Sequence, residues 1–211
     1  MDGERRRGLL RDARLYLVTD GDVGVVREAI AGGVDLVQLR VKDTSDARVL
    51  EAARAFREAC TLVIVNDRPD LAVAAGADGV HVGQSDMSAE EARAIVGPEL
   101  LVGVSTHSRD QVDAAERSTS DYFAVGPVHE TPTKPGRPAV GLGLVRYAAG
   151  RATKPWFAIG GIDPGNAGEV VVAGARRIVV VRAIRDADDP RAAAAALRTA
   201  LEREAVGGAV R

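Results

Sequence analysis

The chain has 211 residues, a net charge of −2 and 46% hydrophobic side chains. These values supply enough apolar material for a sizeable core, and they argue against a general electrostatic attraction to nucleic acid or membranes. The single cysteine, Cys60, rules out an internal disulfide, and no apolar run reaches the length of a membrane span, so we expect a cytoplasmic protein.

The first 14 residues, MDGERRRGLLRDAR, are rich in arginine and are not followed by the apolar core of a leader peptide. We expect residues 1–14 to form an N-terminal arm, with residues 5–7 in solvent. No linker or low-complexity segment interrupts the rest of the chain. It is therefore interpreted as one domain over residues 15–205, followed by a short tail at 206–211.

Eight short runs rich in β-branched residues follow one another, and Ala-rich stretches of helical character lie between them. The runs are LYLVT (15–19), VDLVQLRV (34–41), TLVIV (61–65), GVHV (79–82), LLVGV (100–104), DYFAV (121–125), PWFAI (155–159) and RIVVV (177–181). Strands that are apolar on nearly every residue are typical of parallel sheets covered on both faces, and eight such units predict a single-domain α/β fold, a (β/α)8 TIM barrel. The alternative is an open doubly wound sheet. It would usually carry a Gly-rich fingerprint after its first strand, which LYLVTDGDVGVV lacks.

The second run is unusual because one of its faces turns polar toward the end. Gln38, Arg40 and Lys42 share a face with Val34 and Leu36, because side chains alternate along a strand. An unpaired buried cation is costly, so the two cations must reach water or meet anions.

Other strands also end in polar residues, and in a barrel these ends meet in one mouth. The strand ends carry Asn66, Asp67, Asp86, Ser105, Lys134 and the pair Gly160 and Gly161. Arginine and lysine suit phosphate oxygens, two carboxylates beside them suggest Mg²⁺, and the glycines offer backbone N–H groups to a second phosphate. The residues themselves leave two other interpretations open. Asp67 can be the ion-pair partner of Arg40 or Lys42, and Asn66 with Asp67 can be a turn and helix cap.

The histidines carry less information, and no Ser-His-Asp or Cys-His set is evident. His81 lies mid-strand and is interpreted as a hydrogen-bonded interior residue. His107 and His129 are interpreted as loop residues.

Seven motifs, in order and each near a strand end, resemble the thiamine-phosphate synthase family. They are LYLVTD, QLRVKD, NDRPDLAVAAGADGVHVGQSD, GVSTHS, DYFAVGPVHETPTKPGRP, AIGGI and VVVRAI. The resemblance implies an Mg²⁺-dependent transferase that joins a pyrimidine pyrophosphate to a thiazole phosphate, acting on small molecules and not on nucleic acid or membranes. It is compatible with a homo-oligomer.

The resemblance also implies roles for individual residues. Those implied to hold the pyrophosphate are Gln38, Arg40, Lys42, Asn66, Ser105 and Lys134, with Leu39 and Val41 in the same binding segment. Those implied to hold the thiazole phosphate are Thr131, Pro132, Thr133, Gly161, Val181 and Arg182. Arg40, Lys42, Ser105 and Lys134 would be catalytic, and Asp67 and Asp86 would bind the metal.

Two positions depart from the family pattern: Arg182 stands where some members have serine, and His129 replaces an apolar residue. Two rival functions are considered. A thiazole tautomerase of the same fold would have a histidine directly after Gly126, where this chain has Pro127. A non-catalytic sensor of a phosphorylated metabolite would have little need for both Asp67 and Asp86.

Overall fold

The computed structural model describes residues 1–131 and 138–207, with side chains described up to residue 202. Eight parallel strands form a closed barrel in chain order, and β8 pairs with β1. The strands are β1 (Leu15–Thr19), β2 (Leu36–Leu39), β3 (Val63–Asn66), β4 (Gly79–Val82), β5 (Leu101–Thr106), β6 (Tyr122–Val125), β7 (Trp156–Ile159) and β8 (Ile178–Val180). The predicted TIM barrel is confirmed, and each predicted run contains one strand or most of one.

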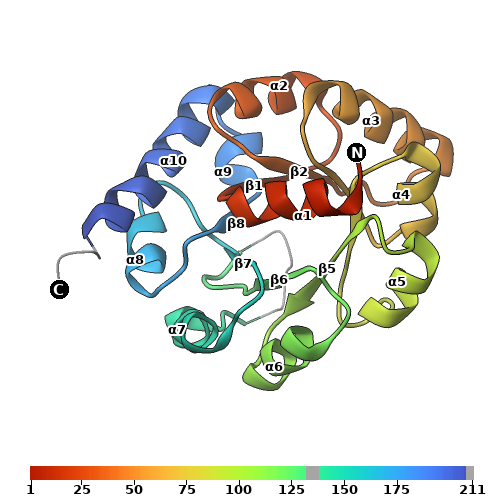
Figure 1. Cartoon of the computed structure of the whole chain (residues 1–211). Helices are drawn as coiled ribbons and strands as arrows, with labels where there is room; N and C mark the ends of the chain where they lie inside the picture. The colour runs from red at the N-terminus through yellow and green to blue at the C-terminus, as the bar shows by residue number, and fades with distance from the viewer. Residues whose placement is uncertain (132–137, 208–211) are drawn as a thin grey trace.

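Helices surround the barrel, as Figure 1 shows, and most of them follow directly on a strand. Within the described residues they are α1 (Gly3–Asp12), α2 (Val23–Ala31), α3 (Asp46–Ala59), α4 (Pro69–Ala75), α5 (Ala89–Val96), α6 (Arg109–Arg117), α7 (Gly141–Arg151), α8 (Ala167–Val172), α9 (Arg182–Arg185) and α10 (Pro190–Gly207). Several begin where the sequence offers a capping side chain. Asp22, Ser45, Ser88 and Ser108 each accept a hydrogen bond from a backbone N–H of the first turn.

The alternation of side chains divides the core into two layers. In β1, Leu15 and Leu17 face the helices, whereas Tyr16 and Val18 face the barrel interior. The interior layer combines aliphatic side chains with three aromatic ones, and Phe157 packs edge-on against Tyr16 at a ring separation of 5.4 Å. This register decides which residue of each strand reaches the mouth of the barrel.

Three aspartates support the opposite end of the barrel, each directly before an even-numbered strand. Asp35, Asp78 and Asp121 accept hydrogen bonds from the backbone N–H at or near the start of the preceding strand, namely from Leu15, Val63 and Val102. Each carboxylate also pairs with at least one arginine. These charges are satisfied locally, as buried or half-buried carboxylates must be.

The N-terminal segment closes this same end, and the expectation of an arm in solvent is wrong at Arg6 and Arg7. Helix α1 lies across the barrel end in Figure 1, and Leu10 packs into the interior layer. Arg6 is buried, with its Nε 3.0 Å from Asp78 Oδ1, and Arg7 Nε lies 2.7 Å from Asp121 Oδ1. The arginines are held because they neutralise the aspartates there.

Among the described residues, none of the helices combines the length and apolar character that crossing a membrane requires.

Candidate active site

Two adjoining cavities open at the carboxyl ends of the strands. The larger has a volume of about 290 Å³ and lies against β5, β7, β8 and the loops after them. The smaller, of about 90 Å³, lies at the barrel centre and is lined by residues from all eight strands. Four residues line both cavities, namely Ser105, Ile159, Val179 and Val181. Two ligands bound in these cavities would therefore meet at a common wall.

The smaller cavity contains the polar residues predicted from the second strand. Gln38 is 4% exposed and points into the barrel, and Arg40 lies half-buried at the mouth. The backbone N–H of Arg40 donates to the carbonyl of Thr19 at 2.8 Å, which fixes the chain just beyond the strand. Asn66, from the end of the neighbouring β3, lines the same cavity. With Ser105, which also lines this cavity, the structure thus brings four of the predicted pyrophosphate ligands together.

Other residues of that segment lie elsewhere. Lys42 is exposed after β2 and does not line either of these two cavities. The side chains of Leu39 and Val41 pack toward the helices. Contacts from Leu39 and Val41 to a ligand would therefore have to come from the backbone.

Asp67 and Asp86 face each other at the ends of β3 and β4. Burial and the charge of Asp86 raise the pKa of Asp67, while a hydrogen bond from Asn66 and the nearby Arg40 oppose this rise. Asn66 Nδ2 lies 2.5 Å from Asp67 Oδ2, and the N–H of Gly83 donates to Asp86 Oδ2 at 2.9 Å. Burial is the largest cause of the raised pKa of Asp67, and together with the like charge of Asp86 it outweighs the effects of Asn66 and Arg40.

This geometry bears on both alternative interpretations. Within the described residues no ion pair joins Arg40 to Asp67 within 4.0 Å, so the two do not form a closed salt bridge. The cap interpretation is wrong, because Arg68 is the N-cap of α4 and no side chain caps that helix. Asp67 has a φ of 58°, in the left-handed region that non-glycine residues rarely adopt.

The described residues contain no group of three or more histidine, cysteine or acidic side chains placed to hold a metal ion. Two carboxylates nevertheless suit Mg²⁺, which usually takes one or two from the protein and completes its shell with phosphate oxygens and water. The mutual repulsion of Asp67 and Asp86 fits a pair that binds a cation. The residues present therefore fit the predicted ion.

The larger cavity is shaped by the loop after β7. Gly160 and Gly161 have φ values of 104° and 64°, a conformation that favours glycine. A Cβ on Gly160 would lie 2.5 Å from the Cα of Pro127, and one on Gly161 would lie 2.7 Å from the Cβ of His129. The pair therefore both turns the chain and lets the loop after β6 approach closely.

That approach carries Thr131 into the lining of the larger cavity, together with Gly161, Val181 and Arg182. The backbone N–H of His129 donates to the carbonyl of Gly160 at 3.0 Å, and its Nε2 lies 3.4 Å from Glu169. The backbone hydrogen bond of His129 thus joins the loop after β6 to the loop after β7, whereas its Nε2 has no hydrogen-bond partner among the described residues. The predicted residues Pro132, Thr133 and Lys134 lie outside the described residues.

The start of α9 forms the far side of this cavity. Strand β8 ends at Val180, one residue before the predicted end, and α9 begins at Arg182. The side chain of Arg182 is exposed, so its backbone is the part held at the cavity.

Sequence reasoning missed several residues that line the cavities. Tyr16 and Arg185 line the smaller one, and His107 lines the larger one. His107 Nδ1 lies 2.5 Å from the carbonyl oxygen of Gly126, which can only accept, so Nδ1 carries the hydrogen. The alternation of β1 would have placed Tyr16 inside, but nothing in the sequence indicates that α9 turns Arg185 toward the mouth.

Comparison with known proteins gives consistent matches over most of the chain. Residues 15–184 match the family described as "Thiamine monophosphate synthase". The thiamine-phosphate synthase of Mycobacterium sp. (strain JLS) is 54% identical over 212 residues, covering 91% of this chain and 94% of that protein. The thiamine-phosphate synthase of Streptomyces avermitilis is 52% identical over 200 residues, covering 89% and 93%. A solved structure, thiamine phosphate pyrophosphorylase from Pyrococcus furiosus, superposes with a TM-score of 0.85 at 35% identity, covering 92% of this chain and 98% of that one.

Proposed function

The chain belongs to the thiamine monophosphate synthase family, and from this premise we propose that it joins 4-amino-2-methyl-5-hydroxymethylpyrimidine pyrophosphate to 4-methyl-5-(2-hydroxyethyl)thiazole phosphate. The products would be thiamine phosphate and pyrophosphate. The protein is accordingly a transferase of thiamine biosynthesis. A cytoplasmic location and a homo-oligomeric state stay predictions.

The observation that carries the proposal is the pair of cavities with one common wall. The smaller cavity, with Gln38, Arg40 and Asn66, would take the pyrimidine and direct its pyrophosphate to the mouth. The larger cavity, bounded by Gly161 and the start of α9, would take the thiazole phosphate. The reacting methylene carbon and thiazole nitrogen would then meet near Ser105, which lines both cavities.

The reaction breaks one C–O bond and forms one C–N bond. Pyrophosphate leaves with the electron pair of the C–O bond, and the pyrimidine amino group stabilises the cation left behind. The lone pair of the thiazole nitrogen then forms the new bond. Neither step requires a strong base from the protein, which agrees with a site made of cations and hydrogen-bond donors.

The charged residues would act on the leaving group. Arg40 is an obligate donor beside the cavity, so it would stabilise negative charge on the departing pyrophosphate. Lys42 is exposed and would reach the same oxygens only from the solvent side, and the sequence predicts a similar role for Lys134. Asp67 and Asp86 would hold Mg²⁺, which supplies positive charge to phosphate oxygens when bound.

A direct assay tests this proposal. The purified protein, given both substrates and Mg²⁺, should release pyrophosphate and form thiamine phosphate, and omission of either substrate should abolish both. Conversion of the thiazole phosphate alone to an isomer, without pyrophosphate release, would instead indicate a tautomerase. Binding of both ligands without turnover would indicate a sensor.

A further inference from the structure

A chain of five hydrogen-bonding side chains crosses the barrel interior beneath the two cavities. Gln38 Nε2 lies 2.6 Å from Tyr16 Oη, which lies 3.1 Å from Tyr122 Oη. Tyr122 Oη lies 3.2 Å from His81 Nδ1, and His81 Nε2 lies 3.0 Å from Ser105 Oγ. We call this set the tyrosine relay. It connects the floor of the smaller cavity to the wall that the two cavities share.

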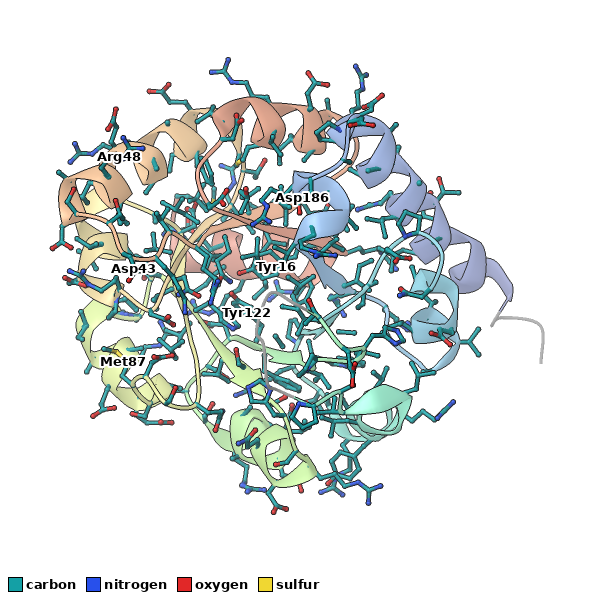
Figure 2. All side chains as sticks on the ribbon, turned by 180° about the vertical axis from the view of Figure 1, so that it is seen from behind. Tyr16, Asp43, Arg48, Met87, Tyr122 and Asp186 are labelled. Atoms are coloured by element: carbon teal, nitrogen blue, oxygen red, sulfur yellow. The ribbon has the colours of Figure 1, made fainter. Side chains whose placement is uncertain are left out.

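The relay is shielded from water and built into the strand register. Tyr16 and Tyr122 are fully buried, and their side chains lie at the centre of the barrel in Figure 2. Gly103 of β5 stands between His81 and Tyr122 in the register. A Cβ there would lie 2.2 Å from Cζ of Tyr122. The glycine therefore leaves the space through which tyrosine and histidine meet.

The direction of the relay follows from counting hydrogens. Burial raises the pKa values of both tyrosines, so each hydroxyl keeps one hydrogen. Tyr16 Oη receives a hydrogen from the amide nitrogen of Gln38, and its other hydrogen-bond partner among the described residues is Tyr122. Tyr16 therefore donates to Tyr122. By the same count, Tyr122 donates to His81 Nδ1.

The consequence appears at the other end of the relay. When Nδ1 of a neutral histidine accepts, the hydrogen is on Nε2, so His81 donates to Ser105 Oγ. Ser105 therefore does not donate its hydroxyl hydrogen to His81. A phosphate oxygen can only accept a hydrogen bond, so a serine that binds one must have its hydrogen available.

We propose that the tyrosine relay holds His81 as the Nε2–H tautomer and thereby orients Ser105 as a hydrogen-bond donor toward pyrophosphate. Tyr16, Tyr122 and His81 are then positioning residues that act through Ser105. The inference rests on the proposed function, because it assigns pyrophosphate as the group that Ser105 meets. The reverse polarity would require the amide oxygen of Gln38 to face Tyr16. It would place the hydrogen on Nδ1 of His81 and consume that of Ser105.

The tautomer is measured directly by nitrogen-15 NMR of the ligand-free protein, whose three histidines are assigned by single substitutions. We expect a protonated Nε2 and an unprotonated Nδ1 at His81. A protonated Nδ1 would overturn the inference even if the protein joins its substrates. Conversely, if His81 has the expected tautomer but the protein does not join its substrates, the absence of turnover refutes the proposed function, while the tautomer of His81 is still established.

The second measurement is the affinity for inorganic pyrophosphate in the presence of Mg²⁺. Tyr122→Phe removes one hydroxyl and should weaken binding about 3- to 30-fold, the range expected for one misdirected hydrogen bond. Tyr147→Phe removes the surface hydroxyl bonded to Asp113 and should change nothing.

A double-mutant cycle then separates positioning from a general disturbance of the barrel. In a Ser105→Ala background, Tyr122→Phe should cause no further loss of pyrophosphate affinity, because the group that the relay orients is already gone. Equal losses in both backgrounds would show that Tyr122 does not act through Ser105.

Discussion

The two carboxylates at the mouth provide the sharpest test of the site. We expect Asp86→Asn to leave the metal-free protein as stable as the wild type or slightly more stable, and nearly to abolish turnover. The substitution removes one of two facing charges, while the asparagine oxygen can still accept the hydrogen bond from Gly83. It also removes a predicted metal ligand, so Mg²⁺ with pyrophosphate should no longer raise the melting temperature as it does in the wild type.

The expected gain is small because Asp86 is exposed. Two unit charges about 4 Å apart repel by about 1 kcal/mol in water and by about 4 kcal/mol at an effective dielectric constant of 20. Solvent screening places this pair near the lower figure. A gain of up to about 1 kcal/mol corresponds to roughly 2–4 °C in the melting temperature of a protein of this size.

The pH dependence has a definite sign. The pKa of Asp67 is raised in the folded protein, which means that folding favours its protonated form. This contribution to the stability of the folded protein is fully present below the pKa of Asp67 in the unfolded chain. That contribution is lost as the pH rises through the folded pKa, where both carboxylates become charged. The advantage of Asp86→Asn should therefore be present at pH 8 and shrink on acidification toward the ordinary pKa of an aspartate.

Melting curves of wild type and variant, first in EDTA and then with Mg²⁺ and pyrophosphate, check these expectations. If Asp86 instead neutralised a buried cation, its loss would destabilise the protein by about 3–5 kcal/mol in either condition. A fall of more than roughly 6 °C in EDTA would therefore refute the metal-site interpretation.

Three further substitutions test separate parts of the molecule. Arg40→Ala should lower kcat about 30- to 1000-fold, because it loses about 2–4 kcal/mol of charge stabilisation in the transition state. The control Arg48→Ala, on the exposed face of α3, should leave kcat unchanged. An unchanged kcat for Arg40→Ala would show that Arg40 has no part in the mechanism. Thr131→Val should raise the KM for the thiazole phosphate and leave the KM for the pyrimidine pyrophosphate nearly unchanged. The reverse result in steady-state kinetics would show that the two substrates are assigned to the wrong cavities. Asp78→Ala should lower the free energy of unfolding, measured by chemical denaturation, by about 3–5 kcal/mol, because it leaves the buried Arg6 without its partner. The kcat at low temperature should be preserved. A loss of stability below about 1 kcal/mol would contradict a stabilising ion pair.

The barrel and the polar strand ends were predictable because both depend on short-range periodicity. Alternation along the second strand places Gln38 inside and Arg40 at the mouth, and the structure confirms both positions. The same alternation does not extend beyond the strand. Lys42 follows the last residue of β2 by three positions, and there the chain turns and exposes it.

Features that depend on contacts between distant segments were not predictable from periodicity. The relay requires Tyr16, His81 and Tyr122 to reach the same layer of the interior, and the space for their contact is left by Gly103. A glycine within a strand signals such an approach, but it does not identify the side chain that arrives. Arg6 presents the same difficulty, because its partner Asp78 lies 72 residues away.

The aspartates at the two ends of the barrel differ in whether partners within the protein neutralise their charge. At the closed end, Asp78 accepts from the backbone N–H of Val63 and from Arg6, so its negative charge is fully matched within the protein. At the mouth, Asp67 faces another carboxylate and has a raised pKa. The repulsion between the two carboxylates does not stabilise the fold, since separating the charges would stabilise the protein without a bound cation. The proposed Mg²⁺ site would give the pair a function, because a cation would gain from both carboxylates at once, and the left-handed backbone at Asp67 would hold its side chain in place for the ion.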